Sequence, residues 1–307
     1  MVIVEATAVT PEGRISPCDL GLWADEQMDA WRWIVADAKA AGATMAVQLN
    51  HAGRKASTGC FSIGYEHESV PEEQGGWQTV GPSANAFGPL DKPRELTVDE
   101  IHAIVDQFRD AAWRAYDIGF DAVEIHAAHG YLLSQFLDPL INEREDEYGG
   151  SFDNRIRILV EVVDAVRSVI PDTMPVLVRV SATDWAAGGW DLDQTVDLAK
   201  VLKKHGVDLM DVSTGGMIPG VTIPVKPDYQ VPFAEQVRSR AEISTTAVGL
   251  ITKPKQAKKI LKSGAADAIE IGRAALRDPN WPLRAAHKLG IPTEDAPYQP
   301  QYVRGAY

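Results

Sequence analysis

Residues 124–157 read EIHAAHGYLLSQFLDPLINEREDEYGGSFDNRIR, and this stretch decides the fold prediction because it joins a buried strand to a helix through polar side chains. The residues FDAVEI form an apolar run of strand length, and His126, His129 and Tyr131 follow closely. Polar and aromatic groups this dense at the end of an apolar strand are costly to bury unless something uses them. We therefore predict that the stretch forms one wall of an active site.

The rest of the chain alternates between apolar runs of strand length and segments with helical spacing. The apolar runs centre near residues 3, 46, 123, 178, 210, 247 and 270. Apolar strands separated by helices are typical of a parallel sheet covered by helices, either a doubly wound sheet or a TIM (β/α)8 barrel. We predict the α/β barrel, because most strands end in polar or glycine residues, as they do when active-site loops share one face. A doubly wound dinucleotide fold would show a Gly-rich turn after its first strand, and no GxGxxG occurs.

The domain organisation predicted for residues 1–307 is a single barrel domain. Seven strands are one fewer than a barrel needs, and the abrupt apolar start indicates that the first βα unit is missing. Residues 50–95 lack periodicity and contain much glycine and proline, which predicts a capping region over the site. Residues 291–307 form a proline-rich C-terminal tail.

Composition narrows the function class. The formal net charge of −13 argues against nucleic-acid binding, which needs a basic face. Two cysteines, Cys18 and Cys60, are too few for a disulfide framework, a four-cysteine zinc site or an iron–sulfur cluster. The start lacks a basic leader, and no apolar segment is long enough to span a membrane. We expect a cytoplasmic protein with no metal ion.

His126 and His129 allow three interpretations. A metal pair would need a third ligand, and the spacing differs from the i, i+4 spacing of helical zinc sites. A structural pair would be satisfied by backbone groups. We favour two donors that hold one substrate oxygen, because imidazoles stabilise developing negative charge. Tyr131 is then a proton donor, since a phenol with a pKa of about 10 stays protonated at neutral pH; its alternative is a core tyrosine.

Other polar residues at strand ends fit a bound cofactor. Arg179 lies inside the apolar run VLVRVSA and must meet an anion, either a cofactor or a buried carboxylate such as Glu124 or Asp211. Gln48 offers both a donor and an acceptor to a heterocycle. The last two strands end in Gly249 and in Gly272–Arg273, which predicts a phosphate cradle, with simple turn geometry as the alternative.

The segment from Tyr148 to Arg157 has a structural explanation. Tyr148-Gly-Gly-Ser predicts a turn, and Asn154, Arg155 and Arg157 stand at the start of the following helix. We expect the arginines to bind acidic neighbours such as Glu143 and Asp146. We predict that these residues have a structural role and hold the reactive residues in place.

The motifs HAAHGYLL and FLDPLIN-x-R-x-D-x-YGGS-x-x-NR-x-R resemble the signature of the old yellow enzyme family of FMN-dependent ene-reductases. The segments QLNHAGRKA, VRVSATD and IGRAALRDP are similar to the bacterial xenobiotic-reductase branch, whose members are often called NADPH dehydrogenases. The resemblance extends from residue 2 to the tail. It implies FMN at the mouth of a (β/α)8 barrel, NADPH or NADH as reductant, and an α,β-unsaturated carbonyl substrate whose C=C bond is reduced by ping-pong hydride transfer.

The resemblance also implies roles for individual residues. The flavin ring and phosphate would be held by Ala6, Gln48, Arg179, Gly249, Gly272 and Arg273. The substrate would be bound by His126, Ala127, Ala128, His129 and Tyr131, with Tyr131 giving the proton to its α-carbon. Arg304, in PQYVRGAY, resembles an arginine that members insert into a neighbouring subunit, which implies a homo-oligomer, a dimer or a tetramer.

Nothing at the front of the chain matches the first strand of the family. Cys18 and Cys60 lie in other segments and do not replace that strand. Because a missing strand opens a barrel, we expect this chain alone to bind FMN weakly or to fold poorly. The alternative to an active ene-reductase is therefore a truncated or vestigial member with impaired FMN binding and no activity.

Overall fold

The apolar runs form one parallel sheet. The computed structural model describes residues 1–60 and 68–307. In it, the strands of this sheet lie side by side in the order in which they occur along the chain. The strands are β1 (Val2–Ala8), β2 (Met45–Asn50), β5 (Ala122–Ala127), β6 (Val176–Ser181), β7 (Leu209–Ser213), β8 (Ser244–Ala247) and β9 (Ala268–Ile269).

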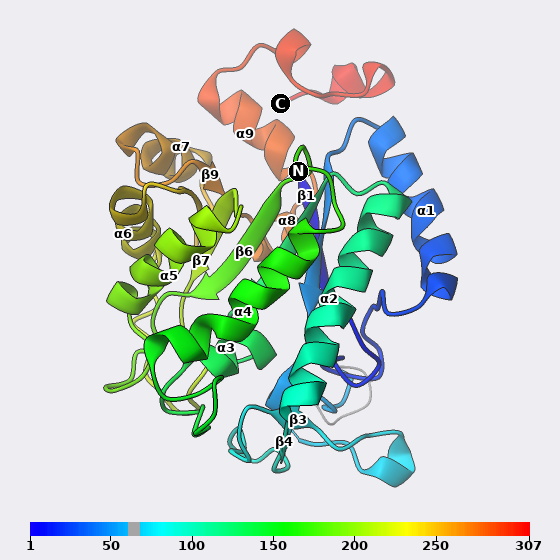
Figure 1. The fold of residues 1–307 in the computed structure, drawn as a ribbon. Helices are drawn as coiled ribbons and strands as arrows, with labels where there is room; N and C mark the ends of the chain where they lie inside the picture. The colour runs from blue at the N-terminus through cyan, green and yellow to red at the C-terminus, as the bar shows by residue number, and fades with distance from the viewer. Residues whose placement is uncertain (61–67) are drawn as a thin grey trace.

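Helices connect these strands and cover the outer face of the curled sheet (Figure 1). The longer helices are α1 (Asp25–Ala40), α2 (Val98–Ile118), α4 (Phe152–Arg167), α5 (Leu192–Lys204), α6 (Val231–Ala241), α7 (Pro254–Ser263) and α9 (Trp281–Leu289). Two short helices, α3 (Leu132–Leu137) and α8 (Arg273–Arg277), follow β5 and β9 directly. All strands therefore end on the same side, where α3 and the loops after the strands lie.

The seven strands predicted from the sequence are the seven strands of the main sheet. In the described part of the chain, β1 pairs with β2 and β9 pairs with β8, and these two form the edges of an open, curled sheet. The missing first βα unit stays a prediction. The sequence did not predict α3, α8 or the small sheet of β3 (Val80–Gly81) and β4 (Arg94–Glu95).

Helix α2 shows why the helices form where they do. Thr97 caps its first turn by accepting a hydrogen bond from Glu100 N at 3.3 Å, while the Glu100 side chain accepts from Thr97 N at 2.8 Å. This capping box satisfies N–H groups that would otherwise lack partners. Ile101 and Phe108 on its inner face are fully buried. Truncating Phe108 to alanine would cost about 3–5 kcal/mol of stability, because the core cannot fill the cavity.

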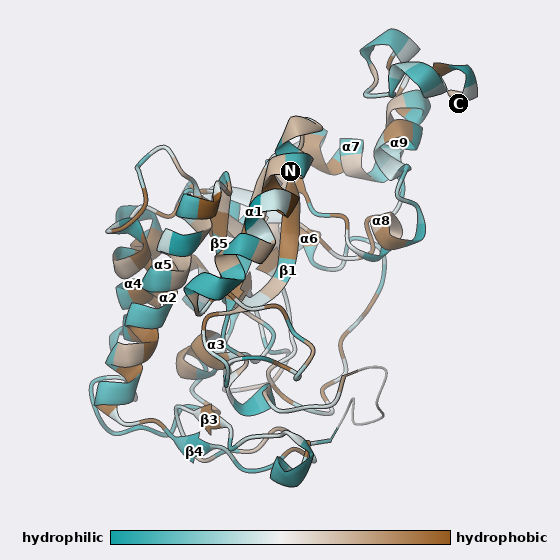
Figure 2. Ribbon diagram, turned by 90° about the vertical axis from the view of Figure 1, so that its right-hand side faces the viewer, coloured by the Kyte–Doolittle hydropathy of each residue, from teal (hydrophilic) through white to brown (hydrophobic). Residues whose placement is uncertain are grey.

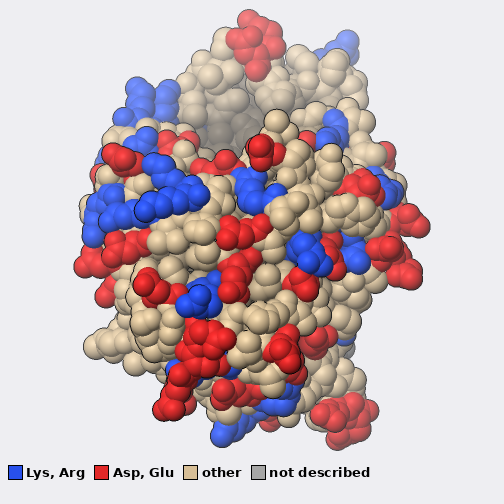
Figure 3. Space-filling model, viewed as in Figure 1, with Lys and Arg blue, Asp and Glu red and all other residues tan. Residues whose placement is uncertain are grey.

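The outer faces of the helices are hydrophilic and carry both signs of charge (Figures 2 and 3). Pairs such as Arg109 with Asp106 are exposed and three residues apart, so each contributes little to stability. On the face shown in Figure 3, acidic and basic side chains alternate over the surface. No helix in residues 1–60 and 68–307 is long and apolar enough to cross a membrane.

Cys18 and Cys60 form a single disulfide, a link that was not predicted from the sequence. The bond joins the loop after β1 to the loop after β2. Thr58 reinforces the same junction, since its N–H and its hydroxyl both donate to Ile15 O at 2.9 Å. Spacing could not reveal this contact, because 42 positions separate the two cysteines.

The proposed capping region and the tail lie at opposite ends of the molecule (Figure 1). Within residues 50–95, the structure contains η1 (Gly53–Lys55), η2 (Glu72–Gln74), β3 and β4, while residues 61–67 lie outside the described part. The tail contains η3 (Thr293–Asp295) and η4 (Pro300–Gly305), beyond α9 at the end where the strands begin. Arg304 is exposed there. The single-domain division stays a prediction.

The Tyr148–Arg157 segment is structural, but its partners differ from those expected. Arg155 donates to Leu137 O at 2.8 Å and to Gly150 O at 2.7 Å, and Arg157 donates to Glu147 O. Both arginines therefore hold backbone carbonyls instead of the carboxylates of Glu143 and Asp146. Asp146 binds a different arginine, Arg144.

Candidate active site

The site begins at the carboxyl ends of three neighbouring strands. His126 on β5 lies opposite Arg179 on β6, which lies opposite Asp211 on β7. Ser213 is the last residue of β7. Since parallel strands end on the same side, His126, His129 and Ser213 are brought together although 87 positions separate the first from the last.

His126 and His129 form a hydrogen-bonded chain with one consistent set of tautomers. Ala128 N–H donates to His126 Nδ1 at 3.2 Å, so the His126 proton is assigned to Nε2, which lies 3.4 Å from His129 Nδ1. His129 Nε2 lies 2.8 Å from Ser213 Oγ, and Ser213 donates to Val180 O at 3.1 Å. Each imidazole therefore carries its proton on Nε2, as inferred from this network.

The backbone at His129 is held in an unusual conformation. Its φ of +58° lies in the left-handed region, which side chains other than glycine rarely adopt. His129 N donates to Ser181 Oγ at 2.9 Å, and its carbonyl accepts from Lys55 Nζ at 2.7 Å. Lys55 also donates to Gly216 O, so one ammonium group joins the loops after β5 and β7. A Cβ on Gly216 would lie 2.8 Å from His129 Cα, so this turn requires glycine.

Tyr131 completes the cluster at the start of α3. Its ring centroid lies 4.9 Å from that of His126, and the two histidine rings are 5.2 Å apart. Lys55 Nζ lies 5.7 Å from the Tyr131 ring and 3.9 Å from the Phe87 ring. The three residues predicted to be catalytic therefore lie together, and Lys55, which was not predicted from the sequence, lies beside them.

Burial sets the protonation of these groups. It lowers the pKa of His129 to about 3 and that of His126 well below its usual value, and nearby positive charge on Arg179 lowers both further. Burial also raises the pKa of Tyr131 to about 12, with the charge of Asp19 acting in the same direction. At neutral pH, the cluster therefore consists of two neutral imidazoles and one protonated phenol.

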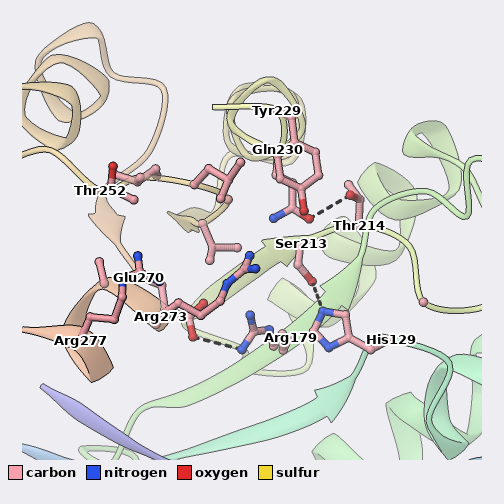
Figure 4. A pocket seen from close by; sticks show the side chains of 17 residues that line it. His129, Arg179, Ser213, Thr214, Tyr229, Gln230, Thr252, Glu270, Arg273 and Arg277 are labelled. Carbon is pink, nitrogen blue, oxygen red and sulfur yellow. Dashed lines mark hydrogen bonds and ion pairs between the residues drawn. The ribbon is translucent and has the colours of Figure 1, made fainter. Parts of the chain in front are cut away.

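A cavity of about 510 Å3 extends from His129 towards β8, β9 and α8 (Figure 4). It is lined by five of the predicted residues: His129, Arg179, Gly249, Gly272 and Arg273. The other predicted residues do not line it: Ala6 on the edge strand β1, Gln48, His126, Ala127, Ala128 and Tyr131.

Gln48 and Arg179 are occupied by carboxylates. Gln48 Nε2 donates to Glu124 Oε1 at 2.6 Å, and both residues are buried. Arg179 Nε lies 3.0 Å from Asp211 Oδ2, and its Nη1 donates to Glu270 Oε1 at 3.0 Å. The ion-pair interpretation of Arg179 with Asp211 is therefore confirmed, while the guanidinium also faces the cavity.

Several residues of the site were not predicted from the sequence. Lys55 stands five residues after β2, in a segment without helical or strand periodicity. Glu270, between Ile269 and Ile271, is an acid in an apolar strand and could have been noticed by the same argument as Arg179. Gln230, whose side chain accepts from Thr214 Oγ1 at 2.8 Å, lies in a loop without any pattern.

Comparison with known proteins gives consistent matches. The model of the NADH:flavin oxidoreductase / NADH oxidase family matches residues 1–291. An NADPH dehydrogenase of Listeria monocytogenes is 48% identical over 97% of this chain and 82% of its own length.

Two solved structures share the fold. Morphinone reductase in complex with tetrahydroNAD superposes with a TM-score of 0.76 at 32% identity, covering 94% of this chain and 78% of its own. The old yellow enzyme homologue from Zymomonas mobilis superposes with a TM-score of 0.76 at 31% identity, covering 93% of this chain and 79% of its own.

These matches and the fold define the class as a flavin-dependent oxidoreductase of the (β/α)8 barrel type, which confirms the predicted fold class. The chain belongs to the NADH:flavin oxidoreductase / NADH oxidase family, known as the old yellow enzyme family. It is an NAD(P)H:flavin oxidoreductase, and the family uses FMN with NAD(P)H as reductant.

The cavity residues fit FMN. Arg273 and Arg277 line the wall next to Gly272, where an added Cβ would meet nothing within 4 Å, so an anionic group has room beside two cations. Gly249 has a φ of +113°, which a side chain would not tolerate, and it lies close to Gln230. Positive side chains and accessible backbone N–H groups are the groups that bind phosphate.

Proposed function

We propose that this chain is an ene-reductase that reduces the C=C bond of α,β-unsaturated carbonyl compounds. The observation that carries the proposal is the cluster of two neutral imidazoles and one protonated tyrosine, of which His129 lines a cavity that fits FMN. The chemistry that FMN supplies when bound is hydride transfer, from NAD(P)H in one half-reaction and to the substrate β-carbon in the other.

His126 and His129 would bind the carbonyl oxygen of the substrate. Both carry a proton on Nε2. The His126 proton points to His129 Nδ1 over 3.4 Å, which is long for a hydrogen bond, while the His129 proton is donated to Ser213 Oγ at 2.8 Å. A carbonyl oxygen would offer a better acceptor to His126, and His129 would turn its proton from Ser213 to the same oxygen, which would gain negative charge as hydride reaches the β-carbon. Neutral donors in a buried site stabilise such charge strongly. Ala127 and Ala128 would form the floor between the two imidazoles.

Tyr131 would supply the proton to the α-carbon. Its phenol is protonated at any physiological pH, and its ring lies against His126. Among the described residues near the two imidazoles, Lys55 is a second proton-bearing group, and burial lowers its pKa to about 7, but its Nζ is bound to two carbonyls. The proposed division is that the histidines hold the oxygen, Tyr131 gives the proton and Lys55 holds the backbone.

Arg179, Gln48 and Ala6 are proposed at the flavin ring, and Gly249, Gly272 and Arg273 at its phosphate. Arg273 has no ion-pair or hydrogen-bond partner in the described part of the chain, which leaves its guanidinium free for an anion. We also propose a homo-oligomer in which Arg304 reaches a neighbouring site. The exposed tail, on the side away from the carboxyl ends of the strands, supports this proposal.

The test is a comparison of the wild type with Tyr131→Phe, each supplied with FMN and NADPH without oxygen. We expect the wild type to convert 2-cyclohexen-1-one to cyclohexanone. The variant should lose about 100-fold or more of this rate, the usual contribution of a proton donor, while flavin reduction by NADPH is unchanged. If the wild type binds FMN and oxidises NADPH but forms no cyclohexanone, the proposal is wrong.

A further inference from the structure

Glu270 is an acidic residue directly after the apolar strand β9, and neither the proposed hydride transfer nor the proton transfer uses it. It follows β9 and is flanked by Ile269 and Ile271. Its side chain is 24% exposed and turns into the cavity, where Oε1 accepts from Arg179 Nη1 (Figure 4). Its second oxygen is buried without a hydrogen-bond partner.

Arg179 faces more negative charge than it can balance. Asp211 Oδ2 lies 3.0 Å from its Nε, Glu270 lies at 3.0 Å, and Glu124 acts on it from β5. Glu124 and Asp211 are almost completely buried, with 0% and 1% exposure. One hydrogen bond satisfies one oxygen of each, from Gln48 to Glu124 and from Thr246 to Asp211.

Burying three ionised carboxylates beside one cation is costly, so at least one carboxyl takes up a proton near neutral pH. Glu270 is the most exposed of the three, and of the three it alone lines the cavity. The other charged groups that line this cavity are Arg273 and Arg277 on α8. The two imidazoles that lie near Arg179 are neutral.

We infer that Glu270 is a positioning residue that holds the Arg179 guanidinium on the cavity wall and, by binding or releasing a proton, sets how strongly the cavity attracts FMN. The inference rests on the proposed placement of FMN in this cavity. An ionised Glu270 neutralises Arg179 and adds a negative charge near an anionic ligand. A protonated Glu270 leaves the positive charge of Arg179 for the flavin.

The sign of the expected pH dependence follows from the surroundings of Glu270. Burial, followed by the charge of Asp211, raises the pKa of Glu270 to about 7, against the opposing effect of Arg179. Burial and Asp211 raise the pKa of Glu124 to about 8. Glu270 therefore loses its proton as the pH rises through about 7, and the affinity for FMN should fall over the same interval.

The experiment compares Glu270→Gln with the wild type and with Glu235→Gln, a matched change on the exposed side of α6. The dissociation constant of FMN is measured by quenching of flavin fluorescence at pH 6, 7 and 8. The phosphate of FMN also titrates near this range, but its effect is common to all three proteins and cancels in their ratio. A charge change in a partly buried site corresponds to about one pKa unit of interaction, or about tenfold in affinity.

We expect Glu270→Gln to bind FMN about tenfold more tightly than the wild type at pH 8 and within about twofold of it at pH 6. Glu235→Gln should follow the wild type. The midpoint potential of the bound flavin should be more positive in Glu270→Gln at pH 8, because the reduced flavin carries more negative charge. A merely structural residue would not shift this potential. If Glu270→Gln folds poorly, Glu270→Met, which is uncharged and of similar length, should show the same loss of pH dependence.

If the dissociation constant of FMN changes with pH in the same way in Glu270→Gln and in the wild type, and both proteins bind FMN, the inference is overturned and the proposed function stays intact. If the fluorescence of FMN is not quenched by any of the proteins at any pH, the proposed cofactor site is wrong, and so is the inference that rests on it. If Glu235→Gln also loses the pH dependence, the effect comes from net charge and not from the Arg179 contact, which likewise contradicts the inference.

Discussion

At the β5–β7 end of the cavity, the polar side chains around His126 and His129 are held by partners inside the chain. At the β8–α8 end, Arg273 and Arg277 have no such partners within the described residues, and an added Cβ on Gly272 would meet open space. The proposed substrate end is thus fixed before any ligand arrives, while the proposed cofactor end keeps its positive charge available. A preorganised substrate end suits stabilisation of developing charge, and an open cofactor end suits a large ligand.

Loss of the disulfide between the loops after β1 and β2 should have the largest effect on stability. Closing a loop of 42 residues with a disulfide stabilises a protein by about 2–4 kcal/mol. Cys18→Ser should therefore lower the free energy of unfolding by about this amount, as measured by urea unfolding. A dithiol reductant should do the same to the wild type and should not affect the variant. Equal stability of the wild type with and without reductant would contradict the prediction.

A matched pair of glycine substitutions tests the comparison directly. Gly216→Ala places a Cβ 2.8 Å from His129 Cα at a φ of +89°, so we expect a loss of about 2 kcal/mol of stability together with most of the enone reduction. Gly272→Ala meets no atom within 4 Å and should be within about 0.5 kcal/mol of the wild type. Thermal unfolding of both proteins measures the difference. Equal losses would show that the two ends are equally constrained.

Lys55→Met should loosen the substrate end without touching the cofactor end. The variant removes the donor to His129 O and Gly216 O while keeping a long apolar side chain against Phe87. Two buried carbonyls without a donor cost about 1–3 kcal/mol. We expect weaker binding of the enone, seen as a higher KM, and an unchanged dissociation constant for FMN. A change in FMN affinity alone would place Lys55 in the cofactor end.

The smallest expected effect is the change in the pH dependence of stability when His129, at the substrate end, is replaced. The pKa of His129, about 3 in the folded protein, lies below its unfolded value of about 6.5, so the unfolded state binds more protons between these pH values. Stability from this residue is complete above pH 6.5 and falls as the pH is lowered. His129→Asn should therefore lose less stability between pH 7 and pH 5 than the wild type does, as measured by urea unfolding. An equal loss would contradict the low pKa.

The strands and the reactive residues could be predicted because they depend on local patterns. The apolar runs located all seven strands, and the position of His126 at a strand end placed it in the site. The contacts of Lys55 with His129, 74 positions away, and of Arg179 with Glu270, 91 positions away, depend on how the strands are arranged. No local pattern encodes these distances. The cysteine pair escaped prediction for the same reason, because a count of two says nothing about whether their loops meet.

The order of strands in the sheet has a consequence for synthesis on the ribosome. Each strand of the main sheet pairs with the strands next to it in this order, so the sheet can grow from β1 onwards as the chain emerges. The roughly 140 residues from Tyr131 to Arg273 take on the order of 7–30 s to make at about 5–20 residues per second. During that interval, a nascent chain already carries the residues of the proposed substrate end but lacks those proposed to hold the phosphate. With the phosphate site as proposed, FMN would bind only after the ribosome has made the chain beyond Arg273.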